Sequence, residues 1–176
     1  MRKVLLFAAV CAAATGVASG VAASHPSRSD RVERQLAEVR RATAKFHDVR
    51  VAEQAGYLDP GPGHCLEVPG LGGMGIHFVN PSLIFDGGVL DPTRPEVLLY
   101  VPTAEGGLRL VGVEYLVRVP DRSGSAAPDL FGKPFDGPMP EHEPNTTGDH
   151  YDQHAWVWSH NPDGPLATWN KEISCP

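Results

Sequence analysis

The sequence predicts a single α+β domain in which a long N-terminal helix packs on an antiparallel β-sheet with long Pro/Gly-rich loops. Three observations point to this fold class. Apolar residues recur at helical spacing in residues 29–56, and short β-type runs separated by turns follow them. The 176 residues include 19 Gly and 17 Pro, which indicates many turns and irregular loops around the regular elements.

Residues 1–23 have the three parts of a secretory signal peptide. Arg2 and Lys3 precede an apolar run from Val4 to Ala14, and small residues lead to an expected cleavage site after Ala23. The apolar run is shorter than the roughly 20 residues that span a bilayer, so we expect no transmembrane anchor after cleavage. The predicted location is the medium, the periplasm or the cell envelope. Residues 24–28 are expected to be a linker, and residues 29–176 the domain.

The first element of the domain is predicted to be an amphipathic helix of about 25 residues. Ser29 or Asp30 can cap its start, and Gly56 can end it in the left-handed conformation. Its apolar stripe must be buried against a sheet or a partner. The stripe consists of Val32, Leu36, Val39, Ala42, Phe46 and Val49.

The β-type runs come later in the chain. Ile76–Val79 is the first predicted strand, and Val97–Val101 with Leu108–Val119 form the clearest hairpin. His154–Trp158 is the last. A helix followed by several such strands is typical of an α+β domain rather than of a parallel sheet.

Cys65 and Cys175 are the two cysteines that remain after signal cleavage. In an oxidising compartment two such cysteines usually form a disulfide, which here would tie the C-terminus to the first loop. A reactive thiol is the alternative, but Cys175 lies one residue from the chain end, where little structure can support a nucleophile.

Composition and motifs exclude several classes of function. Fifteen Lys and Arg against 21 Asp and Glu give a formal charge of −6, which argues against a nucleic-acid partner. The sequence has no nucleophile-elbow serine, no phosphate-binding Gly-Lys loop, no His-Glu-x-x-His helix and no dinucleotide fingerprint. Whether the protein is an enzyme stays open on these grounds.

His150-Tyr-Asp-Gln-His154 is the sharpest local signal for a site. On a strand, His150, Asp152 and His154 share one face, and imidazole with carboxylate suits Zn, Mn, Fe, Ni or Cu. The two histidines are about 13 Å apart on an ideal strand, too far to share one ion. A bulge or loop must turn one of them inward, or they have different roles. Ordinary hydrogen-bonding histidines are the alternative.

Glu114 and His77 are the other candidate ligands. Glu114 lies in Leu110–Leu116 of the predicted strand Leu108–Val119, where both strand faces look buried, so its carboxylate needs a cation or hydrogen-bond donors. A salt bridge to Arg109 or Arg118 is the alternative. Glu141 and His142 lie in the loop before the last strand and are possible further ligands, or else part of a solvated acidic turn.

Four stretches together resemble a group of small exported bacterial proteins of uncharacterised function: Met74–Pro81, Leu90–Tyr100, Val111–Tyr115 and His150–His154. The similarity extends over roughly residues 30–175 and implies a recurring domain. It implies no activity, so no catalytic residue follows from it.

Two hypotheses for function follow. In the first, the protein is an exported metal-binding protein whose divalent transition metal is bound by His77, Glu114, His150 and His154, with Asp152 orienting an imidazole. In the second, it is a non-catalytic secreted binding or envelope-stress module without metal. Its partner would be a small molecule, a polysaccharide or a protein.

Overall fold

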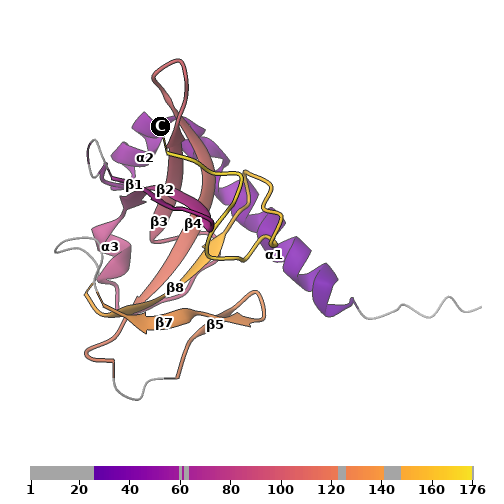
Figure 1. Ribbon diagram of the computed structural model, residues 1–176. Coiled ribbons are helices and arrows are strands. Elements are labelled where there is room, and N and C mark those ends of the chain that lie inside the picture. The colour runs from indigo at the N-terminus through magenta and orange to yellow at the C-terminus, as the bar shows by residue number, and fades with distance from the viewer. Residues whose placement is uncertain (1–25, 60, 62–63, 123–125, 141–147, 176) are drawn as a thin grey trace, which may run out of the picture.

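A computed structural model describes residues 26–59, 61, 64–122, 126–140 and 148–175. It confirms the predicted α+β class, with an N-terminal helix and a curled antiparallel sheet (Figure 1). Among the described residues, no helix has the length and apolar character needed to cross a bilayer. The predicted signal peptide and the loop residues Glu141 and His142 lie outside the described residues.

The predicted helix is three elements rather than one. Helix α1 is Arg28–Thr43, the 3₁₀ turn η1 is Ala44–His47, and helix α2 is Val49–Gln54. Asp48 breaks the run because its backbone is extended (ψ 106°) and its side chain accepts a hydrogen bond from Arg50 N, which starts a new helix.

The cap of α1 also differs from the expectation. Ser27, not Ser29 or Asp30, is the N-cap, and Asp30 completes a capping box by accepting from the backbone N–H of Ser27. Gly56 does have the left-handed conformation expected after the helix, with φ of 94°.

One six-stranded sheet contains most of the strands, in the order β1-β2-β3-β4-β8-β7, and all described pairs are antiparallel. Its strands are Cys65–Val68 (β1), Gly72–Val79 (β2), Val97–Pro102 (β3), Leu108–Arg118 (β4), Asp136–Met139 (β7) and His150–Ala155 (β8). A short helix, α3 (Pro81–Ile84), follows β2, and Asp129–Leu130 (β5) pairs with Lys133–Pro134 (β6). The predicted hairpin is confirmed as β3 and β4.

The two faces of this sheet bury different sets of residues. Leu36 and Val39 of α1 join Phe78, Leu98 and Tyr100 of the sheet in the larger apolar core. The opposite face carries a smaller apolar cluster together with the candidate ligands, and we call it the site face. Its apolar cluster is Val79, Ile84, Val97, Leu99, Val101, Val111, Leu116, Trp156 and Ile173.

The last strand lies earlier in the chain than predicted, at His150–Ala155 rather than His154–Trp158. Strand β8 ends at Ala155, and the next residues turn away from it, since Trp156 N donates to Pro165 O. Trp156 belongs to the site-face cluster, whereas Trp158 donates its indole N–H to Thr43 Oγ1 of α1. Trp158, the predicted end of the last strand, therefore lies outside it, because the strand stops at Ala155.

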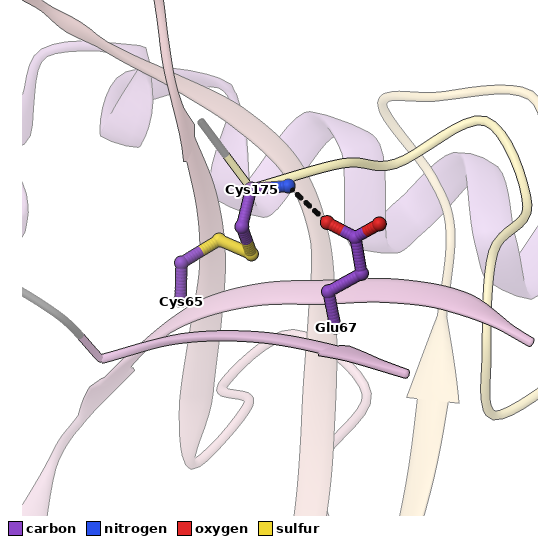
Figure 2. Close-up of a disulfide and its surroundings, with 3 residues drawn as sticks. All are labelled: Cys65, Glu67 and Cys175. Carbon is purple, nitrogen blue, oxygen red and sulfur yellow. Dashed lines mark hydrogen bonds between the residues drawn. A yellow bond between two sulfur atoms is a disulfide. The ribbon is translucent and has the colours of Figure 1, made fainter. Parts of the chain in front are cut away.

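The C-terminal segment is fixed to the first two strands. Cys65 and Cys175 form the predicted disulfide, and Cys175 N donates to Glu67 Oε2 at 2.7 Å (Figure 2). Asn170 forms a bridge with Gly73 of β2. Residues 156–175 therefore return to the sheet beside the site face.

Candidate metal centre

Strand register places His154 directly opposite Glu114. The two residues are partners in the antiparallel pair of β4 and β8, and partners in such a pair have side chains on the same face. His77 comes from β2, on the far side of β3, where it pairs with Leu99. Strand β3 separates the strands of His77 and Glu114, and neighbouring strands lie about 4.8 Å apart. The two side chains must therefore lean toward each other across β3.

A β-bulge in β2 precedes His77. Leu66 pairs with Gly75 and Glu67 with Gly73, so Met74 is the extra residue on β2. Gly75 has φ of 89°, and a Cβ there would lie 2.5 Å from Tyr100 O. Only glycine fits both this conformation and this close approach, so the residue two positions before His77 is fixed by backbone geometry.

His77, Glu114 and His154 form a compact buried group. Each offers one ligand atom, and these atoms all lie within 4.8 Å of one another. His77 Nε2 is 3.4 Å from Glu114 Oε2, and the two imidazole rings have centroids 6.1 Å apart. The three residues are only 1–2% exposed.

These separations fit a single small metal ion. Two atoms that each lie about 2.1 Å from a tetrahedral zinc ion are about 3.4 Å apart, which is the separation of the His77 and Glu114 atoms. Two atoms on opposite sides of one ion are about 4.2 Å apart, so any pair near the 4.8 Å limit would have to move slightly closer to bind one ion. Two imidazoles with one carboxylate are a donor set found at zinc and non-haem iron sites.

His154 is held in place by its neighbours. Its ring lies 6.1 Å from that of Trp156, with the planes 20° apart, so the indole lies over one face of the imidazole. Trp156 is in turn fixed by its indole N–H, which donates to Ala167 O at 2.6 Å. The ring orientation that a metal ligand needs is thus supported by the C-terminal segment.

Asp152 lies beside the group, and its carboxyl hydrogen-bonds Glu114. Burial, followed by the negative charge of Asp136, raises the pKa of Asp152 to about 7, while that hydrogen bond opposes the rise.

His150 is buried but lies outside the group. It starts β8, four residues before His154, where it pairs with Arg118 and Met139. Its Nδ1 is 2.7 Å from Gly148 O. The structure therefore brings His154 to His77 and Glu114 and leaves His150 outside the group.

Two features of this region were not singled out from the sequence. Glu96, which precedes β3, is 2% exposed and its Oε2 accepts from Leu116 N at 3.1 Å. Burial raises the pKa of Glu96 to about 8. A cavity of about 380 Å³ lies next to Asp152, with mostly apolar walls. Its lining residues come from four strands and the C-terminal segment, which no local pattern links.

Comparison of the chain with protein-family models, with curated proteins and with solved structures found no match. The function proposed below therefore rests on the geometry of the site itself.

Proposed function

We propose that the protein is an exported metal-binding protein that holds one divalent transition metal on His77, Glu114 and His154. The observation that carries this proposal is the convergence of three ligand atoms within 4.8 Å in a buried position. Burying a carboxylate is unfavourable unless a positive charge or hydrogen bonds compensate it, and a divalent ion would supply that charge.

Three protein ligands leave at least one coordination position open. Structural zinc sites normally use four protein ligands, whereas catalytic sites keep a position for water or substrate. An ion at this site would lower the pKa of a bound water and polarise a bound oxygen atom. The two imidazoles and Glu114 would orient the ion, while Asp152 would hold the carboxylate of Glu114 through its hydrogen bond.

Export is part of the proposal and rests on two features. The first 23 residues have the composition of a signal peptide. The disulfide between Cys65 and Cys175 is of the kind that persists in oxidising compartments. Amino-terminal sequencing of the protein recovered outside the cytoplasm should begin at Ser24; recovery of intact chain from the cytoplasm alone would contradict export.

The metal proposal is tested by elemental analysis and titration of the mature protein. Apo protein is titrated with Zn²⁺, Mn²⁺, Fe²⁺, Ni²⁺ and Cu²⁺, and thermal unfolding is followed at each addition. We expect one equivalent of at least one ion to bind and to raise Tm, since an ion at 100 times its Kd stabilises the folded state by about 2.7 kcal/mol.

Matched variants locate the ion. His77→Gln, Glu114→Gln and His154→Gln should each weaken binding by at least tenfold, because each removes one of the three ligands. His150→Gln is the control, since this histidine is equally buried on the same strand as His154 but lies outside the group. Equal affinity in all four variants, or no ion bound by the wild type, would overturn the proposal.

A further inference from the structure

The cavity beside Asp152 has the composition of a small-molecule site. Its side walls are Leu66 of β1, Met74 of β2, Met139 of β7 and Trp169 of the C-terminal segment. Its volume of about 380 Å³ is within the range of ligand pockets, which are typically apolar with a few polar groups that fix orientation.

The cavity lies next to the candidate metal centre. Asp152 lines the cavity and hydrogen-bonds Glu114, so a single carboxyl group separates the cavity from a proposed metal ligand. The bulge in β2 supports this arrangement, since it contributes Met74 to the cavity wall three residues before His77.

Two side chains with oxygen atoms line the cavity, Asp152 and Thr168, and one oxygen of Asp152 lacks a hydrogen bond from the described residues. Thr168 donates its hydroxyl to Asp136 Oδ2 at 2.7 Å. Asp152 is 2% exposed, and its Oδ1 accepts no hydrogen bond from any residue that the structure describes. A buried oxygen without a donor is unfavourable, so a ligand that donates one hydrogen bond there would be selected.

The charges around the cavity further limit the class of ligand that it can bind. Among the described residues, those that line the cavity include no Lys, Arg or His, so no cationic side chain among them would pair with an anion. A divalent ion on the adjacent ligands would repel a cation. A neutral hydroxyl group can donate a hydrogen bond to Asp152 Oδ1, needs no cationic partner and is not repelled by the ion. An apolar body fits the remaining walls.

We propose that this cavity binds a neutral alcohol with an aromatic or aliphatic body, whose hydroxyl donates to Asp152 next to the metal. This inference deepens the proposed function by naming its ligand class, and its position beside the open coordination site rests on that function. The apolar body would pack against Met74, Met139 and Trp169, while the hydroxyl sets its orientation.

Four probes of nearly equal size test the ligand class: benzyl alcohol, toluene, benzylamine and benzoate. Binding to the zinc-loaded mature protein is measured by ligand-detected NMR. Benzyl alcohol should bind about 2- to 10-fold tighter than toluene, the gain of one hydrogen bond, and tighter than either charged probe. Tightest binding by benzoate or benzylamine would overturn the proposal.

Variants test the location. Leu66→Trp and Met139→Trp fill the cavity and should abolish binding of benzyl alcohol. Leu71→Trp is the matched control, because Leu71 is exposed between β1 and β2 and does not line the cavity. Asp152→Leu should reduce the affinity for benzyl alcohol to that for toluene, an effect that general loosening of the fold would not produce.

This design distinguishes failure of the cavity proposal from failure of the metal proposal. Every protein is also titrated with Zn²⁺, and benzyl alcohol binding is measured with and without the ion. Zinc binding without benzyl alcohol binding, or equal benzyl alcohol binding by wild type and Leu66→Trp, overturns the cavity proposal alone. Failure of the wild type to bind Zn²⁺ or any of the four other ions overturns the proposed function, whatever the probes do.

Discussion

At the scale of single residues, three carboxyl groups are buried in or beside the sheet. Glu96, Glu114 and Asp152 are each at most 2% exposed, yet they belong to different environments. Glu114 lies 3.4 Å from His77 in the candidate metal centre, whereas Glu96 is held by the backbone N–H of Leu116. Glu96 can therefore be studied without altering a proposed ligand.

Glu96 should make the protein less stable as the pH rises. Below about pH 4.5 its carboxyl is protonated in both the folded and unfolded states. Between there and about pH 8 only the unfolded chain ionises it, so the free energy of unfolding falls as pH rises through this window. The upper limit of the loss is on the order of 5 kcal/mol.

Urea unfolding of wild type and Glu96→Gln between pH 5 and pH 8 measures this effect. Glutamine keeps an oxygen that can accept from Leu116 N and does not titrate, so the variant should lose less stability across this range. Other groups titrate equally in both proteins, which makes the difference between the two profiles specific to Glu96. Parallel profiles would contradict the assignment.

At the scale of elements, local irregularities decide where the site residues lie. With strict alternation along β2, Met74 and His77 would lie on opposite faces of the sheet. The bulge at Met74 changes the alternation and gives the two residues their observed positions. The end of strand β8 has a comparable effect. Because β8 ends at Ala155, Trp158 does not lie on the site face.

Gly75→Ala should therefore be strongly destabilising. The new Cβ would meet Tyr100 O at 2.5 Å, in a backbone conformation with φ of 89° that alanine rarely adopts. We expect a loss of about 2 kcal/mol or more in the free energy of unfolding, and weaker metal binding, since His77 lies two residues away.

Gly107→Ala is the control for this experiment. Gly107 lies in the turn between β3 and β4, and its nearest neighbour would be Thr103 Oγ1 at 3.6 Å from an added Cβ. Its free energy of unfolding should differ from that of the wild type by well under 1 kcal/mol. Similar losses in the two variants would show that the bulge imposes no special requirement.

At the scale of the whole molecule, the disulfide closes the chain around the site face. It joins residues separated by 110 positions, and the segment before Cys175 includes Thr168 and Trp169 of the cavity. The chain-entropy model gives a stabilisation of about 4–5 kcal/mol for a loop of this size.

Reduction should lower stability by an amount approaching that figure, as measured by urea unfolding with and without a phosphine reductant. Cys175→Ser should have the stability of the reduced wild type and should not respond to the reductant. If the reductant destabilised the wild type and Cys175→Ser equally, its effect would not come from this disulfide.

The fold class and the identity of most candidate residues follow from local patterns. Helical spacing predicted the N-terminal helical region, and alternating apolar runs predicted β3 and β4. The break at Asp48 was missed because the apolar spacing continues through it, and only the cap geometry ends the helix. Short strands such as β1 and β7 were missed because glycines and prolines dominate their surroundings.

By itself, the sequence determined that Glu114 is buried in an apolar strand, that histidines are available to meet it, and that Cys65 and Cys175 pair. Only the tertiary structure decided that His77 and His154, and not His150, approach Glu114. The reason is that strand order, register and bulges depend on contacts between residues far apart in the chain, whereas sequence patterns report the periodicity of one segment at a time.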